Sequence, residues 1–240
     1  MILPHPTDAI HQAWLYRILS GIADNSFLAG VLRFKGGTCC AMQGFIDRFS
    51  VDLDFDLIDE KKQKEVHAAL KKLLRKLDLK IKDESRKEPQ FFLKYDNTVS
   101  ERNTLRIDVT FPAPKSNTYE PVRFAEIDRI FYCQTIETMF ANKLVALLDR
   151  YEKHHSITGR DLFDLHTFLL KGYGINKEVI KERRGTGWNM FIPELLGFIE
   201  KKVTQQIIDE DLYTLLPPEI FKRVRKTIKP EVELLLKGRL

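Results

Sequence analysis

The segment from Val51 to Leu57 constrains the fold of this chain more than any other part of its sequence. Apolar residues alternate in it with three aspartates, Asp52, Asp54 and Asp56. Because the side chains of a strand point to opposite faces with a period of two, this alternation predicts a strand with its apolar face toward a core and all three carboxylates on the other face. Aspartate is depleted in strands, so three in one short strand require a compensating reason.

A bound cation is one such reason. Carboxylates at alternate positions of a strand lie about 6.5 to 7 Å apart, so the ionised groups repel and raise one another's pKa unless a cation intervenes. A divalent cation would remove that conflict, and the alternative is a solvated sheet face with acidic residues on it. An EF-hand loop is excluded, because Leu57 replaces its glycine and Gln63 replaces its bidentate glutamate.

A diglycine, Gly36-Gly37, precedes the acidic segment. Residues 31–35 read as a strand, and residues 38–46 as a helix with Thr38 near its N-cap. The glycines therefore lie at a strand-to-helix junction, where the backbone can approach a ligand closely and free N–H groups attract a triphosphate. The alternative is an ordinary tight turn. The spacing matches neither a P-loop nor a dinucleotide-binding fingerprint.

A further acidic strand is predicted at residues 104–111, where Asp108 interrupts an apolar alternation that ends before Pro112. If this strand lies beside the one that carries Asp52 and Asp54, three carboxylates converge. That arrangement suits two magnesium ions about 3.5 to 4 Å apart, which would clamp a phosphoryl transfer. The alternative for Asp108 is an ion pair with Arg106 or with another cation.

These motifs together resemble those of a known superfamily. The matching residues are Gly36-Gly37-Thr38, Arg48-x-Ser50-x-Asp52-x-Asp54, Asp108, Glu137-x5-Lys143-x2-Ala146-x3-Arg150 and Arg160-Asp161-x2-Asp164-Leu165. They are similar to the nucleotidyltransferase fold of the DNA polymerase β superfamily, and most closely to its AbiEii/AbiGii toxin group, over roughly residues 30 to 170. The chain departs from many superfamily members by having Gly-Gly in place of Gly-Ser, and Asp56 has no assigned role.

The resemblance implies a set of site residues. Those expected to bind metal are Asp52, Asp54 and Asp108, those expected to bind the nucleotide are Gly36, Gly37, Thr38, Arg48, Ser50 and Lys143, and those expected to act in catalysis are Asp52, Asp54, Asp108, Lys143 and Asp161. Lys143 and Asp161 would complete the site from the helical side. From the residues alone, a solvated helix face is the alternative for Lys143.

The expected fold is α+β, with a nucleotidyltransferase-type mixed sheet and flanking helices in residues 1–130 and a helical domain in residues 131–240 that completes the active site. Strands are expected at 31–35, 51–58, 90–96, 104–111 and 121–126. Helices are expected at 8–20, 38–46, 60–77, 135–151, 160–171, 176–184, 188–206 and 217–237. Pro217-Pro218 is placed to open the last of them.

The charge of the chain indicates a polyanionic partner. Its formal net charge is +5, and basic residues gather at positions 61–82 and 222–229, where either group could contact RNA phosphates. Three cysteines offer no disulfide framework or paired Cys-x-x-Cys site. Since no apolar run approaches the length of a membrane span, we expect a cytoplasmic protein without a membrane partner.

The function that we expect from the residues and the resemblance is a Mg²⁺-dependent nucleotidyltransferase. It would move a nucleotide from an NTP to an acceptor hydroxyl, with the 3′ end of a tRNA as the expected acceptor and a cognate antitoxin as the expected partner. One alternative is a nucleotidyltransferase or phosphotransferase of the same superfamily that acts on a small molecule. Another is a nucleotide-binding module without turnover, although clustered carboxylates are unnecessary for binding alone.

Overall fold

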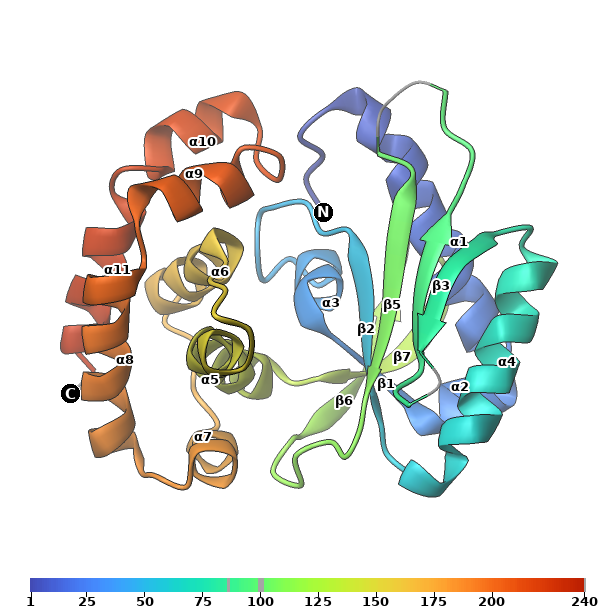
Figure 1. The fold of residues 1–240 in the computed structure, drawn as a ribbon, viewed down its shortest axis with the longest axis horizontal. Coiled ribbons are helices and arrows are strands. Elements are labelled where there is room, and N and C mark those ends of the chain that lie inside the picture. Colours follow the sequence, from blue (N-terminus) through green and yellow to red (C-terminus); the bar gives the residue numbers. More distant parts are fainter. Residues whose placement is uncertain (86, 99–101, 240) are drawn as a thin grey trace.

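The computed structural model of the chain describes residues 1–85, 87–98 and 102–239. Its centre is a seven-stranded mixed sheet with the strand order β3-β4-β5-β2-β1-β7-β6 (Figure 1). The strands are β1 (Leu32–Lys35), β2 (Asp52–Leu57), β3 (Lys80–Ser85), β4 (Gln90–Lys94), β5 (Thr104–Thr110), β6 (Tyr119–Phe124) and β7 (Arg129–Gln134). The pairs β2–β5 and β1–β7 are parallel, and the other neighbours are antiparallel.

Helices cover both faces of the sheet (Figure 1). Those on one face are α1 (Ala9–Ala23), α2 (Ser26–Val31) and α4 (Gln63–Lys76). Those on the other face are α3 (Gly36–Met42) and a helical half made of α5 (Ile136–His154), α6 (Gly159–Leu170), α7 (Lys177–Arg184), α8 (Trp188–Lys202), α9 (Gln205–Leu212), α10 (Pro218–Val224) and α11 (Ile228–Lys237). None of the described helices is both long and apolar enough to cross a lipid bilayer.

The alternation in β2 has the predicted consequence for packing. Leu53 and Phe55 are fully buried, and the Phe55 ring stacks on Phe34 of β1 with the centroids 5.3 Å apart. On α4, Val66, Leu70 and Leu74 recur at helical spacing and are fully buried in the same core; the remaining positions of that helix are largely polar. Burial of each such side chain contributes about 1.5 to 3 kcal/mol, which holds β2 with its aspartates on the opposite face.

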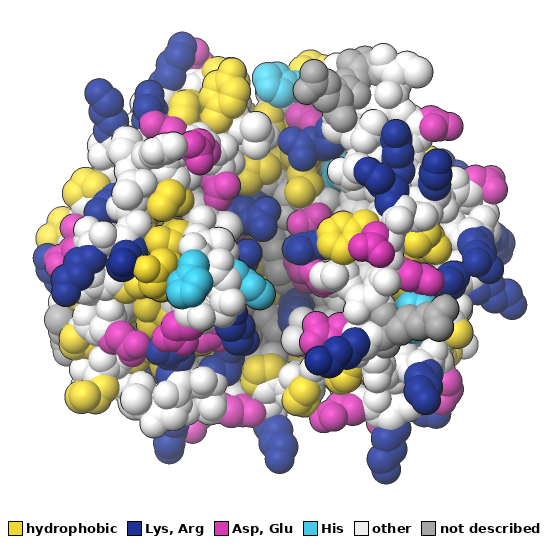
Figure 2. Space-filling model, in the orientation of Figure 1, with side chains coloured by type: hydrophobic (Ala, Val, Ile, Leu, Met, Phe, Trp, Pro, Cys, Tyr) yellow, Lys and Arg dark blue, Asp and Glu magenta, His cyan; other side chains and the backbone are white. Residues whose placement is uncertain are grey.

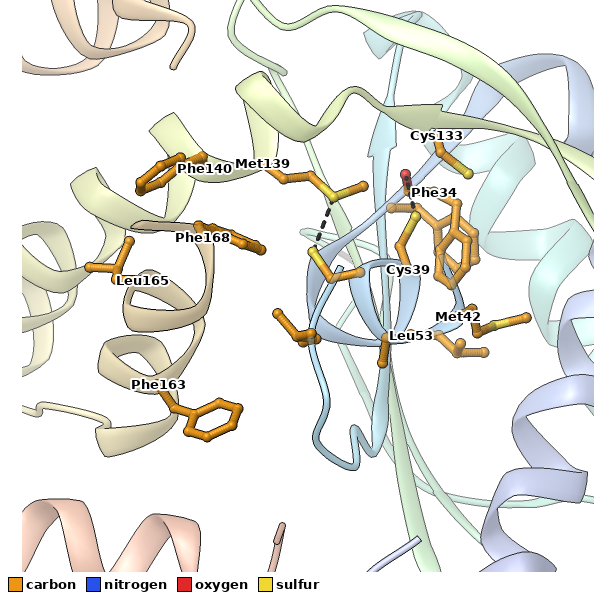
Figure 3. Close-up of a cluster of buried hydrophobic side chains, with 14 of the residues drawn as sticks. Phe34, Cys39, Met42, Leu53, Cys133, Met139, Phe140, Phe163, Leu165 and Phe168 are labelled. Carbon is orange, nitrogen blue, oxygen red and sulfur yellow. Dashed lines mark hydrogen bonds between the residues drawn. The ribbon is translucent and has the colours of Figure 1, made fainter. Parts of the chain in front are cut away.

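The core continues from the sheet half into the helical half (Figure 3). At the junction, the Sγ of Cys40 on α3 lies 3.1 Å from the Sδ of Met139 on α5. Deeper in the helical half, the rings of Phe140 and Phe168 pack with their centroids 5.2 Å apart. All three cysteines are buried free thiols. This apolar seam sets α5 and α6 opposite the acidic face of the sheet.

The α+β fold with a mixed sheet and flanking helices is confirmed, with differences in several elements. The helices α2 and α9 and the strands β3 and β7 are additional, and the helix expected at 38–46 begins at Gly36 and ends at Met42. The helix expected at 188–206 ends at Lys202, and the one expected at 217–237 is divided into α10 and α11. The boundary expected at residue 130 falls inside β7, so the helical half begins at Ile136.

Strand β3 lacked a sequence signal for a physical reason. It is an edge strand, and a register shift between Ile81 and Asp83 breaks the alternation of its side chains. Lys80, Lys82 and Asp83 are all exposed, so the sequence of β3 shows no alternation of apolar and polar residues.

Candidate active site

The predicted neighbours β2 and β5 do pair, and their register brings acids together. Asp54 lies directly opposite Asp108, and Asp52 lies opposite Arg106. Neighbouring strands are about 4.8 Å apart, so side chains of opposed residues on one face are in reach of each other. We refer to Asp52, Asp54 and Asp108 as the sheet acids. The convergence on which the metal hypothesis depends is therefore present in the fold.

The diglycine bend packs directly on these acids. Gly36 has φ +79°, and a Cβ added to it would overlap the carboxylate of Asp54 and lie 2.8 Å from the Asp54 Cβ. A Cβ added to Gly37 would lie 2.7 Å from Ser50 Oγ and 2.9 Å from Arg48 Nη2. Both positions thus require glycine, the first for its backbone conformation and both for close approach.

Asp54 has the most perturbed environment of the sheet acids. Burial, together with the charges of Asp52 and Asp108, raises the pKa of Asp54 to about 6. Burial also raises the pKa of Asp52. Among the described residues, none donates a hydrogen bond to the carboxylate of Asp54 or forms an ion pair with it. The carboxylate is therefore desolvated and repelled without a direct counter-charge, which is the condition that a bound cation would relieve.

The other two sheet acids share one guanidinium. Arg106 Nε lies 3.1 Å from Asp108 Oδ2, and Arg106 Nη2 lies 3.5 Å from Asp52 Oδ2. The amide of Gln90 donates a hydrogen bond to Asp108 Oδ1. The ion pair with Arg106 that the sequence left open for Asp108 thus exists alongside the cluster.

A metal site is not fully assembled in this arrangement. Within residues 1–85, 87–98 and 102–239, no three His, Cys, Asp or Glu side chains are grouped so that they could hold a metal ion. Arg106 contributes to this, because its guanidinium forms ion pairs with both Asp52 and Asp108. The donor set still fits Mg²⁺, which prefers carboxylate oxygens. The unpartnered Asp54 is its best-placed member.

The opposite wall, formed by α5 and α6, carries a second group of buried charges. We refer to Arg48, Lys143, Asp161 and Asp164 as the paired cluster. Lys143 Nζ lies 2.8 Å from Asp161 Oδ1 and 2.9 Å from Asp164 Oδ2. Arg48 forms a two-point pair with Asp164, Nε to Oδ1 at 2.6 Å and Nη2 to Oδ2 at 2.7 Å. The solvated helix face considered for Lys143 is therefore wrong.

The pKa values of the paired cluster move in the opposite direction to those of the sheet acids. The Asp161 and Asp164 carboxylates are also buried, but nearby cations outweigh burial and lower the pKa of both: Lys143 and Arg150 act on Asp161, and Arg48 and Lys143 act on Asp164. The two carboxylates in turn outweigh burial at Lys143 and raise the pKa of its ammonium group. All four groups are consequently ionised at neutral pH.

A cavity of about 430 Å³ lies between the two walls (Figure 2 shows the cleft there). Five of the predicted residues line it: Gly36, Asp54, Asp108, Lys143 and Asp161. The sequence did not identify Asn142 and Arg183, which line it from the helical half. A larger cavity, of about 1070 Å³, lies between α1, α4 and the β6–β7 turn, on the face of the sheet that lacks the sheet acids.

Four predicted nucleotide-binding residues, Gly37, Thr38, Arg48 and Ser50, do not line the cavity. Thr38 is fully buried, and its Oγ1 donates a hydrogen bond to the Asp52 carbonyl oxygen, at 2.5 Å, and lies 3.0 Å from Ser50 Oγ, within hydrogen-bond distance. It is not the N-cap of α3, because Lys35 occupies that position. Ser50 and Arg48 are buried as well. In place of the expected direct contact, these side chains tie α3, β2 and α6 together.

The role of Asp56, which the sequence left open, is structural. Its carboxylate is fully buried and accepts four hydrogen bonds, from Lys35 Nζ (2.6 Å), Gln134 Nε2 (2.6 Å), Tyr119 OH (2.9 Å) and Asn117 Nδ2 (3.1 Å). These donors come from β1, β6, β7 and the loop before β6. Asp56 therefore joins the outer strands to β2, and its satisfied oxygens are not available to a ligand.

Comparisons with known proteins identify a family for this chain. Residues 17–233 match a family model described as "Nucleotidyl transferase AbiEii toxin, Type IV TA system". No curated protein sequence matches the chain.

Solved structures with the same fold include two proteins of Helicobacter pylori and one of Mycobacterium tuberculosis. A putative nucleotidyltransferase from H. pylori is 20% identical, with a TM-score of 0.62, covering 98% of this chain and 95% of its own. JHP933 from H. pylori is 20% identical, with a TM-score of 0.60 and coverages of 99% and 93%. The nucleotidyltransferase toxin MenT4 from M. tuberculosis is 16% identical, with a TM-score of 0.58 and coverages of 96% and 84%.

Proposed function

Because this chain belongs to the AbiEii family of nucleotidyltransferase toxins, we propose that it transfers a nucleotide from an NTP to a hydroxyl group at the 3′ end of an RNA. A tRNA is the acceptor that we propose. The observation that carries the proposal is the in-register pairing of Asp54 with Asp108 beside the diglycine bend, at the edge of the cavity. Acids on neighbouring strands next to a close-approach backbone are what a metal-assisted phosphoryl transfer requires.

The sheet acids would hold magnesium, with Asp54 as the principal ligand and Asp52 and Asp108 as the others. When bound, Mg²⁺ neutralises the triphosphate and lowers the pKa of the attacking hydroxyl. With a pKa of about 6, Asp54 is mostly ionised at neutral pH and can bind a cation. The ion pair of Arg106 with Asp52 or with Asp108 must weaken for all three carboxylates to bind the metal together.

In this proposal, the cations around the cavity bind the triphosphate. Lys35, Lys143, Arg150 and Arg183 line it. Lys143 is held at a defined position by Asp161 and Asp164. Among the described residues, Arg150 forms one ion pair, with Asp161 at 3.5 Å, and it is half-buried, so it can turn toward a ligand at low cost. Positioned cations of this kind stabilise the charge that develops during phosphoryl transfer.

The transfer itself conserves atoms and charge. The terminal hydroxyl oxygen of the acceptor forms a bond to the α-phosphorus, the bond from that phosphorus to the α–β bridging oxygen breaks, and pyrophosphate leaves with the electron pair. Asp108 lies across from Asp54 at the cavity and would accept the proton of the hydroxyl. The protein contributes mainly placement and charge stabilisation.

The biological setting of the proposal is a toxin–antitoxin pair. A type IV system implies a cognate antitoxin, which we propose as the protein partner. The net charge of +5 supports an RNA acceptor over a small molecule. Because NTPs and RNA are cytoplasmic substrates, we propose that the enzyme acts in the cytoplasm.

Incubation with each labelled NTP in turn, Mg²⁺ and total RNA tests the proposal. We expect label in RNA with the unmodified protein and none with Asp54→Asn. Asp24→Asn, which changes an exposed aspartate on the opposite face of the sheet, is the matched control and should retain transfer. Label only on small molecules would support the alternative transferase, and nucleotide binding without any product would support the non-catalytic module.

A further inference from the structure

The acidic face of the sheet continues beyond the cavity onto β4 and β3 as two cross-strand rows. Because residues directly opposite each other point to the same face, the strand register defines these rows. The first, which we call the Phe92 row, is Asp83, Phe92, Arg106 and Asp52. The second, the lysine row, is Lys80, Lys94 and Thr104. Asp52 and Arg106 thus link the catalytic acids to a surface that the proposed nucleotide site does not use.

A second cavity lies over this surface. Its volume is about 590 Å³, and Asp52, Arg106, Phe92, Lys82 and Arg102 are among the residues that line it. The first cavity contains Asp54 and Asp108, whereas the second contains Asp52. The sheet acids therefore lie between the two cavities, which is where the reacting groups of two substrates would meet.

The side chains of this surface combine an exposed aromatic ring with several exposed cations. Phe92 is 40% exposed although it lies among charged groups. Lys80, Lys82 and Lys94 around it are exposed as well. An exposed aromatic ring provides a stacking platform for a base, and nearby cations bind backbone phosphates, which together are typical of surfaces that bind single-stranded nucleic acid.

We infer that the sheet face over β3, β4 and β5 binds the single-stranded 3′ end of the acceptor RNA, an inference that rests on the proposed function. A base near the 3′ end stacks on Phe92, the phosphates that precede it contact Lys80, Lys82 and Lys94, and the terminal hydroxyl reaches Asp52 and Asp108. Phe92 is two strands from Asp52, about 10 Å at the usual strand spacing. A duplex end does not fit this scheme, because its bases are stacked on each other and not free to stack on a ring.

The structure also separates the basic residues that the sequence grouped together. The lysines of α4 lie on the opposite face of the sheet from the sheet acids, and Lys71 there is paired with Glu84 at 2.5 Å. Of the basic residues at positions 61–82, Lys80 and Lys82 are on β3, and Lys82 lines the second cavity. The RNA surface is accordingly on β3 and β4, not on α4.

Binding of a fluorescent single-stranded RNA oligonucleotide, measured by anisotropy without Mg²⁺, tests the aromatic contact apart from turnover. We expect Phe92→Ala to weaken binding about tenfold, the effect of losing one base–aromatic stack. Tyr132→Ala is the matched control, because Tyr132 is also an exposed aromatic of the sheet, at 49%, but lies on β7. The affinity of the Tyr132→Ala variant for the RNA should change less than about twofold. In transfer assays, Phe92→Ala should raise the KM for RNA and leave the KM for NTP unchanged.

The phosphate contacts are tested by the salt dependence of RNA binding. For Lys94→Gln, we expect the slope of log Kd against log salt concentration to fall by about 0.7, the contribution of one phosphate contact to a single strand. Lys72→Gln on α4 should leave the slope unchanged. Circular dichroism and thermal melting establish that each variant is folded.

Each outcome decides between the two proposals. If the unmodified protein labels and binds RNA while Phe92→Ala binds it equally well, the inference about this surface is overturned and the proposed function stands. A 4-thiouridine near the RNA 3′ end should crosslink to peptides of β4 or β5, and a crosslink to α4 would likewise overturn it. If the unmodified protein neither binds nor labels RNA, the proposed function fails and this inference fails with it.

Discussion

The sheet acids and the paired cluster face each other across one cavity, and both contain aspartates near cations, half-buried on the sheet and fully buried in the paired cluster. Their pKa values nevertheless shift in opposite directions. The pKa of Asp54 rises to about 6, whereas the pKa values of Asp161 and Asp164 fall below their ordinary range. Burial raises the pKa in every case, so the difference comes from the partners.

The balance of charge on each wall explains the contrast. In the paired cluster, Arg48 and Lys143 neutralise Asp161 and Asp164, with Arg150 in addition. On the sheet, Arg106 pairs with Asp52 and with Asp108, and no described residue forms an ion pair with Asp54. The comparison teaches that burial alone does not identify a catalytic acid. A buried acid without a matching cation is the better candidate for binding one.

The largest expected effect comes from breaking the paired cluster. Arg48→Ala removes the two-point partner of the buried Asp164, and loss of one member of a buried ion pair costs about 3 to 5 kcal/mol in the free energy of unfolding. Urea denaturation measures this change. Arg123→Ala, which removes an exposed Arg–Asp pair, is the control and should hardly alter the midpoint. Equal stability of both variants would show that the cluster is not a structural element.

The second effect concerns the sheet acids and appears in catalysis. Asp54→Asn should lower the rate of nucleotide transfer at least about a hundredfold, the loss expected when a charge-stabilising group is removed from the transition state. The free energy of unfolding should not fall, because the substitution also removes a repelled charge. If Asp54→Asn were inactive only because it is unfolded, that result would contradict a catalytic role for the sheet acids that is separate from the structural role of the paired cluster.

A smaller effect should follow from the titration of Asp54. With a pKa of about 6, about a tenth of Asp54 is ionised at pH 5, so transfer at subsaturating Mg²⁺ should be about tenfold slower at pH 5 than at pH 8. Asp161 and Asp164 stay ionised over that range. A rate profile that is flat between pH 5 and pH 8 would contradict the raised pKa.

The smallest effect is a change in the pH dependence of stability without metal. The pKa of Asp54 is higher in the folded state than its ordinary value of 3.8, so the folded state binds more protons and its stability falls as pH rises through this interval. Asp54→Asn should therefore raise the Tm at pH 7.5 and have little effect at pH 4. Mg²⁺ should raise the Tm of the unmodified protein at pH 7.5 but not that of the variant. A lower Tm for the variant at pH 7.5 would reverse the sign assigned to Asp54.

Much of the sheet could be predicted because its signals are local. The alternation around Asp52 and Asp54 follows from the period of a strand, and the diglycine follows from the need for a close backbone approach. The prediction did not extend to Thr38, whose buried hydroxyl donates to β2 instead of contacting the cavity. It also missed β3, where the register shift leaves no alternation to detect.

Sequence by itself determined which side chains of β2 share a face and that Asp108 falls on a similar strand, because strand periodicity depends only on residues close together in the chain. Tertiary structure alone decided the roles of the aspartates. Asp164 meets Arg48 from 116 positions away, and Asp56 accepts a hydrogen bond from Gln134, 78 positions away. Desolvation and ion pairing depend on distance in space, so only the folded chain distinguishes the acids that are already neutralised from Asp54, which is not.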